Sequence, residues 1–228
     1  MPEQIAFFDI DHTLIKRSSG ACFLIEANRC GVVPLSLLFG IPGLYFKYIF
    51  QDLHWEDWVD NLPGVHGISR DAFKKIALMS YDRRCKKLLF PKMIERVESL
   101  KAQGIPVWFA TSSVDVLVQP IVDCLGADGL IASQLEFSDG ISTGKFDGKP
   151  AFGIEKLRRV RDQAESLGAD LRDCSFYSDS VHDLPLLEAV GTPVAVNPDF
   201  RLKKIARQRG WEIIRCSLRR MKRSRDTQ

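Results

Sequence analysis

The chain has 228 residues, which suits one large domain or a core domain with a smaller one inserted into it. Its hydrophobic fraction of 45% and charged fraction of 27% are ordinary for a globular protein. Most of the formal net charge of +3 comes from residues 215–225, which read RCSLRRMKRSR. We predict that residues 217–228 form a disordered basic tail. The tail has few charges and no interleaved aromatic residues, so we expect no contact with nucleic acid beyond a non-specific one.

The cysteines and the apolar segments bear on the cellular compartment. No C-x-x-C pair and no zinc-ligand spacing is present, which favours scattered thiols in a reducing compartment. The start, Met-Pro-Glu-Gln, runs into a strand without a signal peptide, so we expect a cytoplasmic protein. The uncharged residues 32–46 are too short to span a bilayer and are broken by Pro34 and Pro42. We expect them to form a helical pair that is buried or docks on a surface. The six cysteines are Cys22, Cys30, Cys85, Cys124, Cys174 and Cys216.

The first part of the chain changes from strand to helix. Residues 5–8 predict a strand, and helices are expected over residues 18–29, 35–50, 55–61 and 69–87. Ser18 and Ser19 can cap the first of these helices, Gly31 can stop it, and Ser69 can cap the last. Residues 16–87 therefore predict an all-helical cap that is inserted directly after the first strand.

The remainder alternates between strands and helices. This alternation predicts an α/β fold with an open, mostly parallel sheet covered by helices on both faces. We expect residues 1–15 and 88–216 to form this three-layer core. The expected strands are 105–110, 130–132, 175–178, 194–196 and 211–214, with a hairpin over 135–146, and the expected helices are 91–103, 114–125, 152–166, 182–190 and 200–209.

Polar side chains follow three of these strands. Asp9 and Asp11 follow the first, residues 111–113 (Thr-Ser-Ser) follow the second, and Asp179 and Asp183 follow the strand SFYS. Ligands bind beyond the carboxyl ends of the strands in such a sheet, so these groups should converge on one pocket. Four carboxylates together call for a hard cation such as Mg²⁺. Taken singly, each residue could instead be a turn former or a helix cap.

The motifs resemble those of a known family. FFDIDHTL is similar to the D-x-D-x-T signature of the haloacid dehalogenase superfamily, FATSS to its second motif and YSDSVHDLPLLEAV to its acidic fourth motif. The hairpin segment ISTGKFDGKPAFGIEK resembles the stretch before the third-motif lysine of subfamily IB, the phosphoserine-phosphatase-like group. The resemblance implies a Rossmann-like core, a helical cap and hydrolysis of a phosphate monoester.

The resemblance also implies roles for the acids. Asp9 would be the nucleophile that forms an aspartyl-phosphate, and Asp11 the general acid and base. Mg²⁺ would bind the carboxylates of Asp9 and Asp179 and the backbone carbonyl of Asp11. Asp183 would support the metal site through a metal-bound water or through hydrogen bonds to its ligands.

The phosphoryl group would be held by hydroxyls and a lysine. Thr111, Ser112 and nearby backbone N–H groups are the expected phosphate ligands. The G-x-x-K spacing favours Lys156 as the site lysine, while Lys145 and Lys149 lie in the same region and Lys149 stays an alternative.

Two histidines depart from the family pattern. His12 stands where the superfamily usually has glycine, and His182 where an asparagine is common. Neither change removes a group that phosphoryl transfer needs. Whether His12 fills the loop or contacts substrate is open.

The substrate is expected to be a small phosphorylated metabolite. A basic cluster near the end of the cap could attract it or could form a solvated helix face. One alternative is a lipid phosphate, reached by peripheral membrane contact of residues 32–46 and the basic tail. Another is a non-catalytic phosphate-binding module with a vestigial site. The basic cluster consists of Arg83, Arg84, Lys86 and Lys87.

Overall fold

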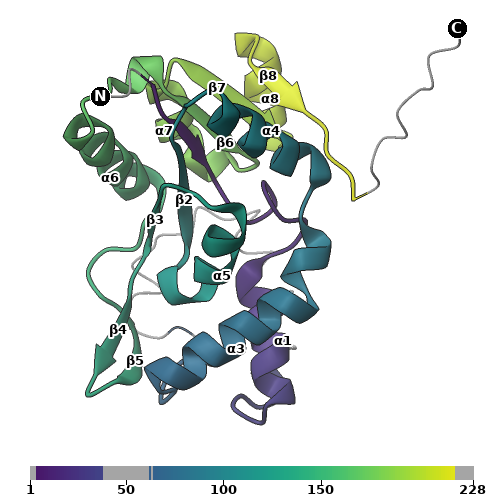
Figure 1. Ribbon diagram of the computed structural model, residues 1–228, viewed down its shortest axis with the longest axis vertical. Coiled ribbons are helices and arrows are strands. Elements are labelled where there is room, and N and C mark those ends of the chain that lie inside the picture. Colours follow the sequence, from purple (N-terminus) through teal and green to yellow (C-terminus); the bar gives the residue numbers. More distant parts are fainter. Residues whose placement is uncertain (1–3, 38–61, 63, 219–228) are drawn as a thin grey trace, which may run out of the picture.

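The computed structural model describes residues 4–37, 62 and 64–218. A six-stranded parallel sheet runs in the order β3-β2-β1-β6-β7-β8, and a separate antiparallel hairpin is formed by β4 and β5 (Figure 1). In chain order the described elements are β1 (Ala6–Phe8), α1 (Ser19–Arg29), α3 (Arg70–Arg83), the 3₁₀ helix η2 (Cys85–Leu88), α4 (Pro91–Ala102), β2 (Val107–Val114), α5 (Asp115–Leu125), β3 (Gly129–Ser133), β4 (Leu135–Ser138), β5 (Ile141–Phe146), α6 (Gly153–Ser166), the 3₁₀ helix η3 (Leu171–Asp173), β6 (Ser175–Ser178), the 3₁₀ helix η4 (Val181–Asp183), α7 (Leu184–Ala189), β7 (Thr192–Val196), α8 (Phe200–Arg209) and β8 (Glu212–Ile214).

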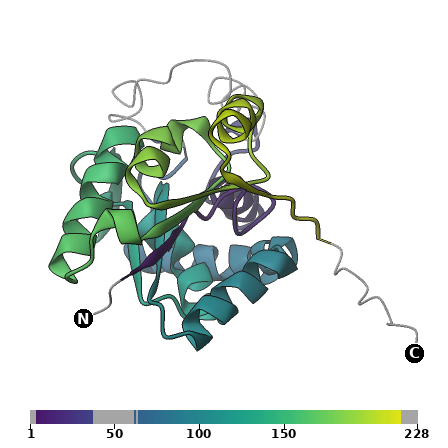
Figure 2. The same ribbon diagram turned by 90° about the horizontal axis from the view of Figure 1, so that it is seen from above.

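The short strand β1 lies in the middle of the sheet and is fully buried. Its side chains alternate between two cores, as a strand covered on both faces requires. Ala6 and Phe8 pack with residues of α4 and α5, whereas Phe7 packs with residues of α6, α7 and α8. The result is a three-layer arrangement of helices, sheet and helices, which Figure 2 shows from above.

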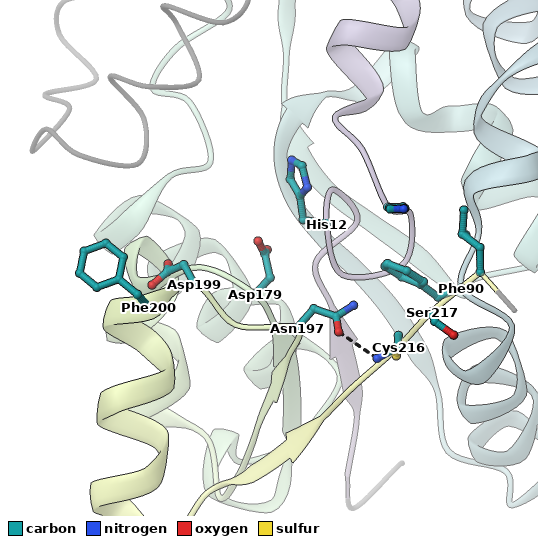
Figure 3. Close-up of a pocket in the computed structure, with 10 residues that line it drawn as sticks. His12, Phe90, Asp179, Asn197, Asp199, Phe200, Cys216 and Ser217 are labelled. Carbon is teal, nitrogen blue, oxygen red and sulfur yellow. Dashed lines mark hydrogen bonds between the residues drawn. The ribbon is translucent and has the colours of Figure 1, made fainter. Parts of the chain in front are cut away.

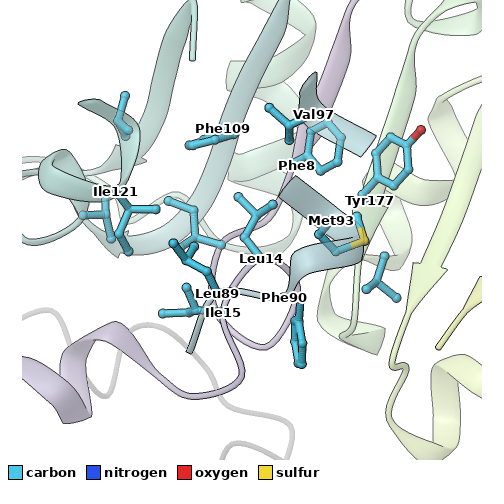
Figure 4. Close-up of a cluster of buried hydrophobic side chains, with 14 of the residues drawn as sticks. Phe8, Leu14, Ile15, Leu89, Phe90, Met93, Val97, Phe109, Ile121 and Tyr177 are labelled. Atoms are coloured by element: carbon cyan, nitrogen blue, oxygen red, sulfur yellow. The ribbon is translucent and has the colours of Figure 1, made fainter. Parts of the chain in front are cut away.

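Aromatic rings hold the strands together on the α4 and α5 side. The ring of Phe8 stacks on that of Tyr177 with centroids 4.1 Å apart, and it meets Phe109 edge-on at 6.5 Å (Figure 4). These residues come from β1, β6 and β2, the three strands that lead into the predicted site. Their packing therefore fixes the relative positions of the strand ends.

Helices α1 and α3 form a third core together with the hairpin. Phe23 of α1 stacks on Phe73 of α3 with ring centroids 4.4 Å apart, and Phe73 meets Phe137 of β4 edge-on. Backbone bonds also join this region to β5, including Gly67 N–H to the Ser142 carbonyl at 2.8 Å. The described helices of residues 16–87 thus pack on the hairpin, and they also reach the core on the α4 and α5 side of the sheet through Cys22 of α1 and Tyr81 of α3.

The fold class is confirmed: the structure has an α/β, Rossmann-like core with a parallel sheet. Two expected boundaries were wrong by the largest margin. Strand β2 continues to Val114, with a register shift between Ala110 and Val114, so residues 111–113 belong to the strand. The helix expected over 69–87 ends at Arg83 and is followed by η2.

Some expectations fall on residues outside the description. They include most of the helices expected over 35–50 and 55–61, and the tail from residue 219 onwards. Within the described ranges, no helix is both long and apolar enough to cross a membrane. The division into a core and a 16–87 cap stays a prediction.

Candidate active site

The predicted site residues lie at the carboxyl ends of β1, β2 and β6. Strand β1 pairs with both β2 and β6, so the residues that follow these strands are neighbours at one edge of the sheet. Asp9 is anchored by a bond from its N–H to the Tyr177 carbonyl at 2.9 Å. Asp179 follows β6 directly, and its carboxylate accepts a bond from the Thr13 hydroxyl at 3.3 Å.

Lys156 joins two of the predicted acids. Its side chain is only 2% exposed, and its Nζ lies 3.3 Å from Asp9 Oδ1 and 2.7 Å from Asp183 Oδ1. The second oxygen of Asp183 accepts a bond from the Ser178 hydroxyl at 2.7 Å. Lys156 is carried by the first turn of α6, whereas Lys145 and Lys149 are exposed on the preceding segment. Lys156 is therefore the lysine that contacts Asp9.

Burial and crowding shift the pKa values of this group. Burial raises the pKa of Asp9 to about 7, the carboxylates of Asp183 and Asp11 add to the rise, and Lys156 opposes it. Burial and the nearby Asp9 carboxylate raise the pKa of Asp179 well above its usual range. Burial alone would lower the pKa of Lys156, but Asp183 and Asp9 outweigh it and raise that pKa. The site is a crowded set of acids, two of which, Asp9 and Asp183, contact the buried ammonium of Lys156.

The donor set fits a hard cation. The Asp9 carboxylate lies close enough to Asp179 to raise the pKa of that residue, and a cation bound by both carboxylates would relieve this repulsion. Among the described residues, no group of three or more His, Cys, Asp or Glu side chains is arranged to hold a metal by itself. Mg²⁺ commonly binds through one or two carboxylates and completes its shell with water and substrate phosphate. The Asp9 and Asp179 carboxylates match this pattern.

Asp11 has a different environment from Asp9. Its Oδ1 accepts a bond from the Ser19 N–H at 2.8 Å, and its Oδ2 accepts bonds from the Ser19 hydroxyl at 3.0 Å and the Ser113 hydroxyl at 2.8 Å. Ser18 is the N-cap of α1, accepting from the Ala21 N–H. Ser19, which the sequence suggested as a second capping residue, instead binds the carboxylate.

The hydroxyl residues at the end of β2 lie in the same region. Thr111 is 1% exposed, and its Oγ1 accepts a bond from the Ser113 N–H at 3.2 Å. The carbonyl of Ser112 accepts a bond from the Ser133 hydroxyl at 2.8 Å, which ties β2 to β3. These contacts order the segment without using the Thr111 hydroxyl proton.

A pocket of about 530 Å³ opens beside Asp179 (Figure 3). His12 and Asn197 both line it with a positive φ, 61° and 45°, a conformation that costs a non-glycine residue energy. His12 therefore stays in a glycine-like backbone position while its side chain lies at the pocket. The remaining lining residues are Lys16, Phe90, Asp199, Phe200, Cys216, Ser217 and Leu218.

Sequence reasoning missed several contacts of the site. Ser178 and Ser19 were not expected to bind acids, because a single hydroxyl in a strand or at a helix start carries no distinctive signal. Of the basic cluster, Arg83 and Arg84 form ion pairs with Glu26, a fully buried residue of α1. Both guanidinium groups share a single carboxylate, which offsets one of the cluster's four positive charges and weakens its role in attracting substrate.

Comparison with known proteins identifies the family of the chain. The family model described as haloacid dehalogenase-like hydrolase matches residues 6–188. The chain is 34% identical over 215 residues to a phosphoserine phosphatase of Mycobacterium tuberculosis, covering 91% of this chain and 69% of that protein. It is 36% identical over 221 residues to a histidinol-phosphatase of Neisseria meningitidis serogroup C, covering 93% and 98%.

Two solved structures extend the comparison. A protein of unknown function from Bordetella pertussis Tohama I has a TM-score of 0.83 and 31% identity, with coverage of 96% of this chain and 100% of that one. A phospho-aspartyl intermediate analogue of phosphoserine phosphatase has a TM-score of 0.70 at 19% identity, covering 93% of each chain, and supports the fold alone. The chain belongs to the haloacid dehalogenase-like hydrolase family and is a phosphoric monoester hydrolase.

Proposed function

We propose that the protein hydrolyses a small phosphorylated metabolite in two steps, with Asp9 as nucleophile and Mg²⁺ as cofactor. The observation that carries the proposal is the pair of acids on the β1 loop. Asp9 is held beside the buried ammonium of Lys156, and Asp11, two residues on, is held separately by hydroxyl groups. Two carboxylates with different environments can take different tasks.

In the first step a carboxylate oxygen of Asp9 attacks phosphorus and the ester P–O bond breaks. Asp11 transfers a proton to the departing oxygen, so the alcohol leaves neutral and Asp9 carries an acyl phosphate. In the second step a water attacks phosphorus, Asp11 takes its proton, and the Asp9–phosphorus bond breaks. Inorganic phosphate leaves and both acids return to their starting forms.

Lys156 supports the attack electrostatically. Its raised pKa keeps the ammonium charged, and its contact with Asp9 offsets the repulsion between a carboxylate and a phosphate. Asp183, held in turn by Ser178, fixes the Lys156 side chain from the other side. Thr111 and Ser112, with the N–H groups near them, would bind the phosphoryl oxygens.

Mg²⁺ would be held by the Asp9 and Asp179 carboxylates and the Asp11 carbonyl, with Asp183 supporting the site through its hydrogen bonds. The cation would supply neutralisation of the negative charge that builds up on the phosphoryl oxygens. Thr13 orients Asp179 through the bond to its carboxylate.

The relatives suggest a substrate class. Phosphoserine and histidinol phosphate, which the names of two relatives imply as their substrates, are both phosphate esters of a primary alcohol with an amino group on the next carbon. We propose substrates of this size and type.

The test is hydrolysis of a panel of phosphate esters with and without Mg²⁺. The panel contains 4-nitrophenyl phosphate, phosphoserine, histidinol phosphate, glycerol 3-phosphate and phosphatidic acid in vesicles. We expect Mg²⁺-dependent release of phosphate and, after acid quench with a radiolabelled substrate, a hydroxylamine-sensitive label on the wild type that Asp9→Asn lacks. Turnover of phosphatidic acid alone would favour the lipid phosphatase, and no turnover of any ester would favour a binding module.

A further inference from the structure

We propose that Ser19 is a positioning residue for Asp11, and that with Ser113 it aims the general acid at the leaving oxygen. The inference rests on the proposed function, because it assigns the acid's orientation to a residue of the first cap helix. The proposed role of Ser19 concerns proton transfer by Asp11 and does not extend to the attack by Asp9.

The contacts restrain both oxygens of the Asp11 carboxylate. Ser19 reaches Oδ1 through its N–H and Oδ2 through its hydroxyl, while Ser113 reaches Oδ2 from the other side. The two hydroxyl oxygens lie 3.2 Å apart, so the three side chains form one connected group. With both oxygens engaged, the carboxylate cannot turn about its side-chain bonds without breaking a hydrogen bond.

Burial makes these contacts costly to lose. Ser19 is fully buried, and its hydroxyl has its recorded contacts within this group. A buried hydroxyl needs a partner, and Asp11 provides it. A serine hydroxyl can donate to a carboxylate and accept from a carboxylic acid. The group therefore stays connected when Asp11 gives up a proton and when it takes one back.

The two serines come from different parts of the fold. Ser113 lies near the end of β2 in the core sheet, and Ser19 is the first residue of α1. Helix α1 continues into the cluster that packs on α3 and the hairpin. The direction of the Asp11 carboxylate is thus set jointly by the core and by the first turn of the cap helix, and any shift of α1 shifts the acid.

A positioning role differs from a merely structural one in its dependence on the leaving group. A 4-nitrophenolate ion departs without a proton, whereas an alkoxide needs one from the general acid. Misaiming Asp11 should therefore slow alkyl phosphates and spare aryl phosphates. A loss of folding or of phosphate binding would slow both alike.

The experiment compares kcat/KM of Ser19→Ala for 4-nitrophenyl phosphate and for the alkyl phosphate of the panel that the wild type turns over best. We expect a loss of about 10- to 100-fold for the alkyl ester and of less than about 3-fold for the aryl ester, a fraction of what general acid catalysis supplies. Ser19→Thr, which keeps the hydroxyl, should restore most of the alkyl activity.

Two further variants guard the interpretation. In an Asp11→Asn background, Ser19→Ala should change the alkyl-to-aryl ratio by less than about 2-fold, because both substitutions remove the same step. Ser69→Ala also removes a serine hydroxyl at the start of a helix, where Ser69 caps α3 by accepting from the Ala72 N–H at 3.2 Å, and it should leave the ratio unchanged.

The outcomes separate the two claims. A wild type that hydrolyses neither ester overturns the proposed function. An active wild type whose Ser19→Ala variant loses both activities equally, or neither, overturns the role of Ser19 and leaves the function standing.

Discussion

Asp9 and Asp11 are two residues apart, yet they are held by different parts of the molecule. Asp9 contacts Lys156 of α6 and is anchored on the backbone of β6, so all of its recorded partners belong to the core. Asp11 contacts Ser113 at the end of β2 and Ser19 at the start of α1. Asp9 is buried, whereas Asp11 is partly exposed.

In the mechanism that we propose, this difference assigns the two halves of the reaction to two regions. Attack on phosphorus would depend on groups fixed by the packed sheet, and that geometry would be the same for every phosphate ester. Proton delivery would depend on the alcohol that leaves, and the proposed acid is held by the first residue of α1. Substitutions around Asp9 should thus affect all substrates alike, and those around Asp11 should affect them according to their leaving groups.

The largest effect is expected for Asp9→Asn. An amide cannot form the acyl phosphate, so kcat should fall by at least about 10³-fold for every ester of the panel. Because burial and neighbouring acids raise the pKa of Asp9, a neutral amide should fit there without loss of thermal stability. Phosphate release and a thermal melt check both points, and a variant that kept substantial turnover would remove Asp9 from the mechanism.

Lys156→Met should cost both activity and stability. The substitution keeps the length of the side chain but leaves Asp9 and Asp183 buried without their cation, and breaking a buried ion pair typically costs about 3–5 kcal/mol. We expect turnover of aryl and alkyl esters to fall equally, by about 10²-fold or more. The measurements are denaturant unfolding and kcat/KM.

Lys149→Met is the matched comparison for the lysine. Lys149 is exposed, so its replacement should change the free energy of unfolding by less than about 0.5 kcal/mol. A larger loss of activity in Lys149→Met than in Lys156→Met would reverse the assignment of the site lysine.

The raised pKa of Asp9 predicts how stability depends on pH in the metal-free protein. The pKa rises from 3.8 to about 7 on folding, so the folded state binds more protons between those values and its stability falls as pH increases through that window. Added Mg²⁺ should raise the melting temperature more at about pH 8 than at about pH 5, since the cation stabilises only the ionised acids.

Asp179→Asn tests whether the effect of Mg²⁺ on the melting temperature comes from binding at these acids. It removes one of the crowded acids, so the metal-free variant should melt higher than the wild type at about pH 8. It should also lose most of the Mg²⁺-dependent rise. An equal rise in both proteins would place the metal elsewhere.

The sheet, and the placement of the acids at the ends of its strands, could be predicted because both leave local signals. A buried apolar strand followed by two aspartates, as at residues 5–11, is visible without knowledge of the fold. The G-x-x-K spacing likewise pointed to Lys156, whose proximity to Asp9 depends on a contact across 147 positions. Ser19 and Ser178 left no such signal, because a single hydroxyl residue a few positions from an acid forms no distinctive pattern.

Glu26 is another residue whose contacts the sequence did not reveal, and its substitution is expected to have the smallest effect. The basic cluster at the end of α3 could attract an anionic substrate, but Arg83 and Arg84 pair with the buried Glu26 of α1. Glu26→Gln should lower stability by about 1–3 kcal/mol, less than a fully buried pair because Arg83 is 51% exposed.

Glu26 also tests whether a change farther along α1 affects Asp11 without affecting Asp9. It lies two turns along α1 from Ser19, so loosening the link between α1 and α3 should disturb Asp11 and spare Asp9. We expect kcat/KM of Glu26→Gln to fall by about 2- to 5-fold for alkyl esters and to stay unchanged for aryl esters. Arg29→Gln, an exposed change on the same helix, is the control and should alter neither. An equal loss on both ester types would mean that α1 affects Asp9 as well as Asp11. The separation between the two acids would then hold only for their direct contacts with Ser19 and Ser113.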